Sequence, residues 1–212
     1  MEKENSIRFI LVRHGETERN LEKRIQGQTD SPLSERGRQQ SEVLARRLAR
    51  SGRLQAVYSS NLGRALATAA LIAEATGHEV VADERFRELS FGEAEGSTWD
   101  IINRDFSGIS YRWRDHEDGI RFPGGESRAE GVGRALAGMR HIAGNHPSGD
   151  VVIVTHGGIL ASLFGEILQI PPGIRPACKI ENASINILRL KTDKDRWKIM
   201  TWGDVSHLED FA

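Results

Sequence analysis

The sequence predicts an α/β protein with a largely parallel central sheet. Short apolar runs that are typical of buried strands alternate along the chain with amphipathic stretches that are typical of helices. Two of these runs end alike: residues 9–12 lead into Arg13 and His14, and residues 151–155 lead into His156, with a glycine after each histidine. Ligands bind beyond the carboxyl ends of the strands in such sheets, so we expect both histidines in one pocket.

The first half of the chain predicts three strands and two helices. Residues 7–12 form a nearly continuous apolar run, the pattern of a strand buried on both faces. After a polar loop, Ser34 can cap a helix that reaches about Arg50. A second helix has an apolar face and is closed by Gly77. The remaining ranges are 55–58 for the second strand, 62–76 for the second helix and 79–82 for the third strand.

The second half predicts an irregular segment followed by the rest of the sheet. Residues 90–125 are rich in Gly, Arg and aromatic residues and are expected to be irregular. Within them, residues 98–123 could form a lid over the pocket, because their cations and rings suit an anionic or ring-bearing substrate. The whole chain, residues 1–212, is expected to form a single domain. The later elements are a helix over 126–146, a strand over 151–155, a helix over 159–168 and strands over 183–190 and 197–202.

Composition excludes several classes of function. The chain has 212 residues, of which 38% are hydrophobic, and 29 Lys and Arg against 30 Asp and Glu give a formal net charge of −1. A general nucleic-acid binder needs a basic excess or a basic face, so no nucleic-acid partner is expected. Basic and aromatic residues such as those of the lid segment also occur in sites that bind single-stranded nucleic acid. Here, however, Asp115, Glu117 and Asp118 offset the positive charge of the segment.

The cysteine content and the termini indicate the compartment. Cys178 is the only cysteine, so no internal disulfide can form, which fits a reducing compartment. The polar N-terminus and the short apolar run after it are unlike a signal segment or a membrane span. We therefore expect a cytoplasmic protein with no membrane partner. Exposed last strands and tails often pair, so the sequence is also compatible with a homodimer.

His14 is the candidate nucleophile. Neutral imidazole is a good nucleophile near pH 7, and histidine is a known covalent catalyst. A backbone carbonyl near its other ring nitrogen would fix the tautomer, and Gly15 would let a phosphate approach the main chain closely. The alternative is a strand-end histidine that only caps a loop. The adjacent Arg13 and the second His-Gly site favour the catalytic interpretation.

Cationic side chains at the strand ends could bind a phosphate. Arg13 and Arg64 are candidate clamps, because fixed guanidinium groups stabilise the charge of phosphoryl transfer. His156 could be a second, protonated donor, and Gly157 and Gly158 open a helix whose N-terminal amides favour an anion. The alternatives are a solvated helix position for Arg64 and a polar plug in a strand-to-helix turn for His156.

A proton donor and neutral ligands complete the set of candidates. The leaving alkoxide of a phosphate ester needs a proton, which a carboxyl group with a raised pKa can give. For that role the residues leave Glu88, Glu84 and Asp83 open. Neutral donors could come from the loop after the first site, or that loop could be ordinary; its candidates are Asn20, Gln26 and Gly27. No Cys/His cluster has zinc spacing and no acidic loop looks like a calcium site.

Short motifs follow one another in a fixed order along the chain. They are Arg13-His14-Gly15-Glu16-Thr17 with Asn20, Gln26-Gly27, Asp30-Ser31-Pro32-Leu33-Ser34, Tyr58-Ser59-Ser60, Arg64-Ala65, Glu88, Glu95-Gly96, Gly124-Gly125-Glu126-Ser127 and Thr155-His156-Gly157-Gly158. In this order they resemble the histidine phosphatase superfamily, also called the phosphoglycerate mutase-like family. Residues 203–208 resemble its small broad-specificity phosphatase branch. One departure is Ala94, where many members have tryptophan.

The resemblance implies a fold and a role for each candidate. The fold is a phosphoglycerate mutase-like three-layer sandwich, with a mostly parallel sheet between layers of helices. His14 would carry the phosphoryl group as phosphohistidine, and Glu88 would be the proton donor. No metal and no cofactor is implied. The remaining assignments are Arg13, Arg64, His156, Asn20 and the Gly157 amide to the phosphate, and Gln26 and Gly27 to the substrate.

The resemblance predicts a metal-independent phosphatase whose partner is a small phosphorylated metabolite. Family mutases tend to carry a longer insertion between the positions of Glu88 and His156, and this chain is compact there. A 2,3-bisphosphoglycerate-dependent phosphoglycerate mutase has the same catalytic residues and stays an alternative. Phosphatases specific for α-ribazole phosphate or phosphoserine are further alternatives, although the phosphoserine branch typically has histidine where Phe91 stands. A non-catalytic scaffold on this fold usually lacks a catalytic residue, and none is missing here.

Overall fold

The computed structural model describes residues 6–174 and 178–211 of the chain. Its strands are β1 Ser6–Arg13, β2 Leu54–Ser59, β3 Val80–Ala82, β4 Gly149–Thr155, β5 Ile185–Lys191 and β6 Arg196–Asp204. They form one sheet in the order β3-β2-β4-β1-β5-β6. Neighbours from β3 to β1 are parallel, whereas β5 runs antiparallel to both β1 and β6. The predicted mostly parallel sheet is confirmed, and β5 is its one reversed strand.

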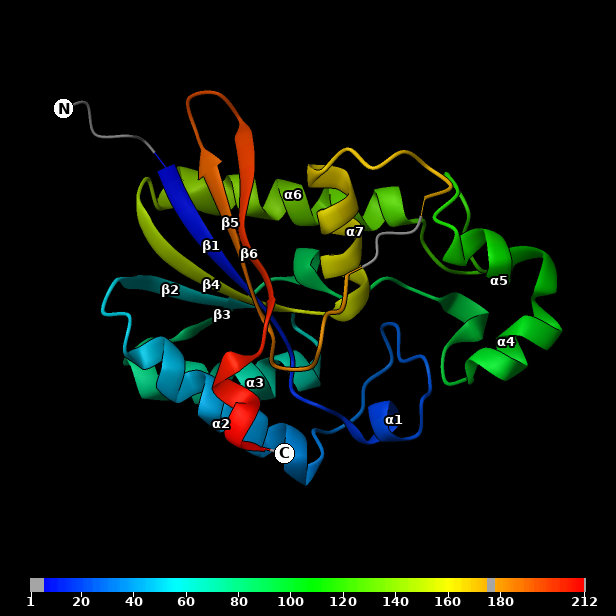
Figure 1. The fold of residues 1–212 in the computed structure, drawn as a ribbon, viewed down its shortest axis with the longest axis horizontal. Coiled ribbons are helices and arrows are strands. Elements are labelled where there is room, and N and C mark those ends of the chain that lie inside the picture. Colours follow the sequence, from blue (N-terminus) through cyan, green and yellow to red (C-terminus); the bar gives the residue numbers. More distant parts are fainter. Residues whose placement is uncertain (1–5, 175–177, 212) are drawn as a thin grey trace.

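Helices cover both faces of the sheet (Figure 1). They are α1 Glu18–Leu21, α2 Glu35–Ala49, α3 Gly63–Thr76, α4 Trp99–Asp105, α5 Ser107–Arg114, α6 Arg128–Asn145 and α7 Gly157–Ile167. On β1, Phe9 and Leu11 belong to the buried cluster of α6 and α7, whereas Ile10 and Val12 belong to that of α2 and α3. Since successive side chains of a strand point to opposite faces, both faces of β1 are apolar. The predicted three-layer sandwich is confirmed.

The other predicted strands and helices lie within a few residues of their expected ends. Ser34 caps α2 by accepting a hydrogen bond from the Gly37 N–H, and Gly77 ends α3 in the left-handed region at φ 70°. The helix expected over 159–168 begins two residues earlier, at Gly157, with His156 as its N-cap. This early start brings His156 and the first turn of α7 to the same place.

The expectation of an irregular segment over residues 90–125 is wrong in part, because it contains α4 and α5. Ile102 and Trp113 on these helices are buried in the cluster of α6 and α7. Arg104 and Arg112 are exposed on the same helices. The abundant arginines therefore obscure, in the sequence, the apolar face that is buried in the fold.

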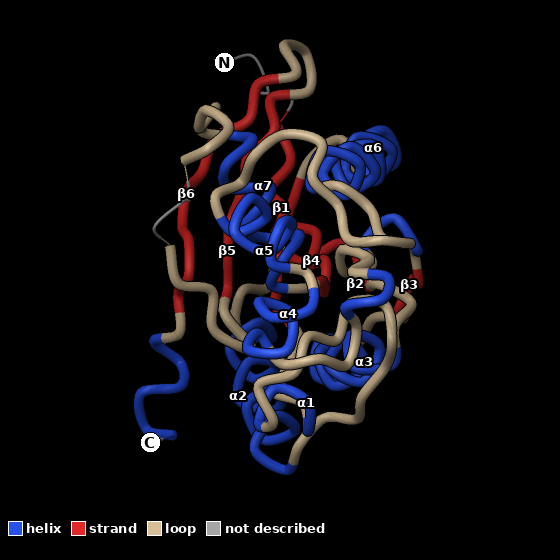
Figure 2. The backbone as a smooth tube through the Cα atoms, turned by 90° about the vertical axis from the view of Figure 1, so that its right-hand side faces the viewer, coloured by secondary structure: helices blue, strands red, loops and turns tan. Residues whose placement is uncertain are grey.

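The carboxyl ends of β1, β2 and β4 lie side by side. The His14 N–H donates to the Thr155 carbonyl at 3.1 Å, and the Ser60 N–H donates to the Val154 carbonyl at 2.9 Å. Helices α4 and α5 lie beyond this edge, apart from the two layers that cover the sheet (Figures 1 and 2). The sheet thus delivers three polar strand ends to one place, as predicted from the sequence.

Candidate active site

The His14 ring is held in one tautomer by its own backbone. Its Nδ1 lies 2.7 Å from the Gly15 carbonyl oxygen, which can only accept, so Nδ1 carries the proton. Nε2 therefore presents a lone pair, and the Arg64 Nε–H donates to it at 3.3 Å. The carbonyl contact expected from the sequence is present.

The His14 ring is also kept neutral. Burial lowers its pKa well below the usual 6.5, and the positive charges of Arg64 and Arg13 lower it further, against the Gly15 hydrogen bond. A neutral ring keeps the Nε2 lone pair available at physiological pH. The same two arginines that suppress protonation would attract an anionic phosphate to that nitrogen.

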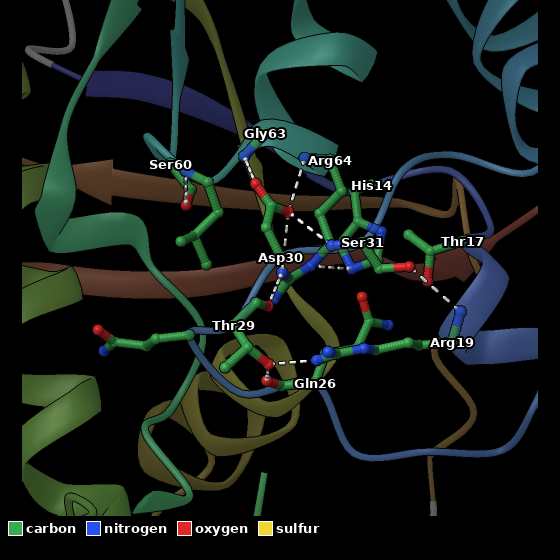
Figure 3. Close-up of polar contacts among 12 residues, drawn as sticks. His14, Thr17, Arg19, Gln26, Thr29, Asp30, Ser31, Ser60, Gly63 and Arg64 are labelled. Atoms are coloured by element: carbon green, nitrogen blue, oxygen red, sulfur yellow. Dashed lines mark hydrogen bonds and ion pairs between the residues drawn. The ribbon is translucent and has the colours of Figure 1, made fainter. Parts of the chain in front are cut away.

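Arg64 lies in the first turn of α3 and is buried, with 1% of its surface exposed. Its guanidinium donates to the carbonyls of Gly27 at 2.7 Å and Thr29 at 2.9 Å. Asp30 accepts from the Arg64 N–H at 3.3 Å and also from the Gly63 N–H, so it caps α3 (Figure 3). Burial lowers the Arg64 pKa, and Glu88 and Asp30 oppose that shift. The alternative of a solvated helix residue is wrong.

Arg13 lies at the end of β1, and only part of its guanidinium group is hydrogen-bonded within the described structure. Its Nη1 donates to the Ile180 carbonyl at 2.6 Å. Its Nε is buried and has no hydrogen-bond partner among the described residues. Burial lowers its pKa, and the charge of Glu88 opposes that shift. A buried N–H without a partner costs free energy, and an oxyanion in the pocket would remove that cost.

His156 is held in the opposite tautomer to His14. The Ser60 hydroxyl oxygen lies 2.8 Å from Nε2 of His156 and accepts from the Leu62 N–H at 3.3 Å. Among the described residues, Nε2 is the one acceptor found for the buried Ser60 hydroxyl proton, so we assign Nε2 as the acceptor, which leaves the ring proton on Nδ1. His156 Nδ1 is buried and has no partner among the described residues. The two rings are close, with centroids 5.1 Å apart.

The expectation that His156 is protonated is wrong for the pocket without ligand. Burial lowers its pKa well below 6.5, and the charges of Arg64 and Arg13 lower it further. The ring nevertheless remains a hydrogen-bond donor, because the neutral tautomer carries its proton on Nδ1. His156 can therefore donate to a phosphate oxygen without a positive charge of its own.

Glu88 occupies the N-terminus of α7. Its Oε2 accepts from the Gly158 N–H at 2.9 Å, and its Oε1 accepts from the N–H groups of Ile159 at 3.1 Å and Leu89 at 2.8 Å. The helix amides that were expected to bind a substrate anion are thus partly taken by a side chain of the protein. The Gly157 N–H, at the first helical position, has no acceptor within the helix.

Geometry also separates Glu88 from the other carboxylates that the sequence left open. Asp83 pairs with Arg85 and accepts from its N–H at 2.9 Å, which caps the 3₁₀ helix Glu84–Phe86. Arg134 donates to the Glu88 carbonyl at 2.9 Å and so fixes the backbone of that residue. Against the lowering effect of burial, the charge of Glu88 raises the pKa of both Arg13 and Arg64, so Glu88 lies near the two candidate phosphate clamps.

The three neutral candidates lie between β1 and α2, Asn20 in α1 and Gln26 and Gly27 in the loop after it, and their surroundings differ. Asn20 Oδ1 accepts from the Thr17 N–H at 3.1 Å and from Asn182 Nδ2 at 3.2 Å. Gln26 is buried, and its Oε1 has no partner among the described residues. Gly27 has φ 55°, and a Cβ there would collide with the carboxylate of Glu95, so this loop position requires glycine.

Sequence reasoning gave no role to Ser60, Asn182 or Arg134, which orient the site from outside. Asn182 donates to the His14 carbonyl at 3.0 Å as well as to Asn20. Ser60 directly follows a strand, which is the signal that had singled out the two histidines. Asn182 and Arg134 reach the site from distant parts of the chain, so no local pattern indicates them.

No described helix is long and apolar enough to cross a membrane. Within residues 6–174 and 178–211, no three His, Cys, Asp or Glu side chains are grouped so as to hold a metal ion. The guanidinium groups of Arg13 and Arg64 bring positive charge to this pocket.

A family model described as histidine phosphatase superfamily (branch 1) matches residues 9–205. The chain belongs to this superfamily. It is 37% identical over 204 residues to phosphoglycerate mutase-like protein 4 of Arabidopsis thaliana, covering 95% of this chain and 87% of the relative. It is also 37% identical over 213 residues to the probable phosphoglycerate mutase GpmB of Salmonella choleraesuis, covering 96% and 95%.

Solved structures with the same fold include phosphatases. A mycobacterial glucosyl-3-phosphoglycerate phosphatase in complex with VO3 is 33% identical, with a TM-score of 0.83 over 92% of this chain and 98% of that one. The phosphoserine phosphatase of Entamoeba histolytica in complex with 3-phosphoglyceric acid is 29% identical, with a TM-score of 0.83 over 95% and 99%. The superfamily and these neighbours make the chain a phosphoric monoester hydrolase.

Proposed function

We propose that this histidine phosphatase hydrolyses small phosphomonoesters without a metal ion, through a phosphohistidine intermediate on His14. One observation carries the proposal: a neutral His14 presents the Nε2 lone pair in a buried pocket beside Arg64 and Arg13. Beside it, His156 offers an N–H rather than a second lone pair. A nucleophile and fixed donors for the transferred group therefore stand together.

The reaction has two steps. In the first, His14 Nε2 forms a bond to phosphorus, the phosphorus–oxygen ester bond breaks, and the leaving oxygen takes a proton from the Glu88 carboxyl group. In the second, a water oxygen attacks the phosphohistidine and gives its proton to Glu88, and the bond between phosphorus and Nε2 breaks. Atoms and protons balance, and inorganic phosphate leaves with the neutral imidazole restored.

The fixed donors suit the charge that develops on the transferred phosphoryl group. Arg13 Nε and His156 Nδ1 are buried donors without a partner among the described residues. Arg64 Nε would turn from His14 Nε2 to a phosphate oxygen as that nitrogen becomes bonded. Asn20 and the Gly157 amide complete the proposed phosphate site. Such preorganised donors stabilise the transition state, so a metal ion is not required for charge stabilisation.

A mutase that depends on 2,3-bisphosphoglycerate is the second candidate. Its support is the similarity to proteins called phosphoglycerate mutase-like protein 4 and probable phosphoglycerate mutase. A mutase must return the phosphoryl group to the substrate before water reaches the phosphohistidine. Hydrolysis is favoured here because the chain is compact between Glu88 and His156, where family mutases tend to carry an insertion.

The surroundings of the site complete the proposal. We propose that residues 98–123 are the substrate segment of a single domain, and that Gln26 and Gly27 contact the substrate. A phosphatase specific for phosphoserine, like the Entamoeba neighbour, is ranked lower because Phe91 stands where that branch typically has histidine. The single Cys178 fits a cytoplasmic location. No membrane or nucleic-acid partner is proposed, and a homodimer stays a prediction.

The test is phosphate release in EDTA from a panel of phosphomonoesters, with His14→Ala assayed in parallel. The panel includes 3-phosphoglycerate with and without 2,3-bisphosphoglycerate. Release that persists in EDTA and disappears in the variant would support the proposal. Release that EDTA abolishes would contradict the metal-independent mechanism. Formation of 2-phosphoglycerate that depends on 2,3-bisphosphoglycerate and proceeds without phosphate release would identify a mutase.

A further inference from the structure

A cavity of about 400 Å³ opens directly beside Glu88. Leu89 and Gly158 line it, and their N–H groups are two of the three that hold the Glu88 carboxylate. If Glu88 protonates the leaving oxygen, as proposed above, this neighbouring cavity can take the rest of the leaving alcohol. The lining therefore determines which alcohols fit, and this inference rests on the proposed function.

The cavity has aromatic walls that also hold cations. The Arg114 guanidinium lies 4.7 Å from the centroid of the Trp99 ring, and that of Arg128 lies 4.4 Å from the centroid of Trp113. Trp113 is itself fixed, because it is 2% exposed and packs against Phe91 at a centroid distance of 5.2 Å. Stacking on a fixed ring restricts a guanidinium and leaves its N–H edge for a ligand.

The charged side chains that line this cavity among the described residues are positive. Within residues 6–174 and 178–211, the cavity lining includes Arg114 and Arg128 but no aspartate or glutamate. Arg128 Nη1 donates to the Ser162 hydroxyl at 3.2 Å, which fixes that side chain. Arg114 makes no hydrogen bond or ion pair with any residue in the described part of the chain. A guanidinium group that lines a binding cavity and has no carboxylate partner in the protein favours a ligand that carries a carboxylate or another oxyanion.

We propose that this cavity is the leaving-group subsite and that it selects alcohols carrying a second oxyanion, with Arg114 as the specificity-determining residue. A carboxylate and a phosphate have the same planar edge of acceptors that a guanidinium fork matches. The oxyanion lies at the Arg114 side of the cavity, and the ester oxygen lies at the Glu88 side. The substrate class is a small phosphomonoester with an acidic alcohol.

Three esters with one carbon skeleton test the proposal. They are 3-phosphoglycerate, glycerol 1,3-bisphosphate and glycerol 3-phosphate, whose alcohols carry a carboxylate, a second phosphate and no second oxyanion. The wild type should show kcat/KM for one or both acidic esters at least about tenfold above that for glycerol 3-phosphate, the ratio expected of one charge-assisted hydrogen bond. The first two esters distinguish a carboxylate from a phosphate as the preferred oxyanion.

Two arginines on one helix give the matched comparison. Arg114→Gln should reduce the preference for the acidic esters to near one. Arg112→Gln should leave the preference intact, because Arg112 pairs with Glu117 at 2.7 Å and does not line the cavity. Arg114→Lys, which keeps the charge but loses the fork, should retain part of the preference. These ratios compare esters on one protein preparation, so a lower folded fraction does not alter them.

The failures are distinguishable. Equal kcat/KM for the three esters in the wild type would overturn the subsite proposal and leave the phosphatase function standing. A preference that survives in Arg114→Gln would also overturn it. Release from none of the three esters and from none of a wider panel would mean that the proposed function itself is wrong.

A second inference comes from the opposite side of the site. Asn182 donates to the His14 carbonyl at 3.0 Å and to Asn20 Oδ1 at 3.2 Å. The Thr17 N–H and hydroxyl also donate to Asn20 Oδ1, at 3.1 and 3.0 Å. Three donors on one oxygen fix the orientation of the amide, so its Nδ2 is the group left to face a ligand. We infer that Asn182 is a positioning residue that acts through Asn20.

A double-mutant cycle tests that coupling, because only residues that act together deviate from additivity. Asn182→Ala should raise KM for a phosphomonoester by about threefold to tenfold, the worth of one hydrogen bond. In protein that already carries Asn20→Ala, adding Asn182→Ala should change log KM by less than half of its change in the wild type. An equal change in both backgrounds would overturn the positioning role and leave Asn182 as a general structural contact.

Discussion

The ends of β1 and β4 carry the same short pattern, a histidine followed by glycine, but the structure holds the two rings in opposite ways. At β1, His14 Nδ1 donates to the Gly15 carbonyl, so Nε2 is left with a lone pair. At β4, His156 Nε2 accepts from Ser60, so Nδ1 is left with the proton. One neutral ring therefore offers a nucleophile and the other offers a donor.

This difference arises from the partner of the second ring nitrogen, not from the strand that carries the ring. The partner of His14 is the next residue in the chain. The partner of His156 is 96 positions away, at the end of β2. The same local sequence can therefore give two different chemical groups, depending on what the fold brings to the far side of the imidazole.

The largest expected effect separates the two histidines by replacing each with alanine. His14→Ala should lower kcat/KM by about 10⁴-fold or more, since the covalent step is lost. His156→Ala should lower it by about 10²- to 10³-fold, as for one transition-state donor. Rapid quench with a ³²P-labelled ester should trap labelled protein with His156→Ala but not with His14→Ala.

Circular dichroism of both variants is the control for folding. Labelled protein in His14→Ala would mean that another residue is the nucleophile. Equal losses in the two variants, with no labelled protein in either, would mean that the two rings act as one unit and that the distinction drawn from their tautomers is wrong.

The next effect concerns Glu88, which lies on the His156 side because it accepts from the first turn of α7. Glu88→Gln keeps the shape but removes the acid, so esters of poor leaving groups should slow by about 10²- to 10⁴-fold. A p-nitrophenyl ester should slow much less, because its leaving group needs no proton. Steady-state kcat/KM on alkyl and aryl esters measures the difference, and an equal loss for both would contradict the proton-donor role.

A smaller effect should follow from loosening the His156 tautomer. Ser60→Ala removes the hydroxyl that donates to Nε2, so the ring loses its fixed orientation, and kcat/KM should fall by up to about tenfold. Ser59→Ala is the matched control, because Ser59 is equally buried but its hydroxyl donates to the Ser60 carbonyl at 2.8 Å. The ¹⁵N shifts of the His156 ring report the tautomer directly. Unchanged shifts in Ser60→Ala would contradict the assignment.

The sequence predicted the sheet and most of the helices because their signals are local. Both faces of β1 are buried, so its sequence is a continuous apolar run that can be recognised directly. Ser34 can likewise be recognised as a helix cap from its residue type and position. Helices α4 and α5 were missed, since exposed arginines such as Arg112 interrupt the apolar spacing of Ile102 and Trp113. That face is buried only by tertiary packing, in which Trp113 contacts the rings of Phe91 and Phe122.

The candidate site was predicted in its members but not in its protonation. His14, Arg64 and His156 were found because each follows a strand, and the structure brings all three together. The neutral state of His156 could not be foreseen, because it depends on burial and on charges from three separate elements. The contact of Glu88 with the N-terminus of α7 also joins distant segments. Such non-local contacts leave no pattern in the sequence.

The smallest expected effect is on the pH dependence of stability. Burial lowers the pKa of both His14 and His156 well below 6.5, so the native state holds fewer protons than the unfolded chain, whose histidines titrate near 6.5. This contribution to the free energy of unfolding is complete above pH 6.5 and is lost as the pH falls from there toward the native pKa values. The urea concentration at the midpoint of unfolding should therefore fall as the pH is lowered from about 7.5 to about 5.5.

His156→Ala should reduce that fall, because one of the two buried titrating groups is gone. His141→Ala, at an exposed position on α6, should keep the wild-type fall. The comparison uses the slope with pH rather than the absolute midpoint, since the cavity left by His156 lowers stability at every pH. An identical slope in wild type and His156→Ala would mean that this ring binds protons in the native state as it does in the unfolded chain, and the lowered pKa assigned to His156 would be wrong.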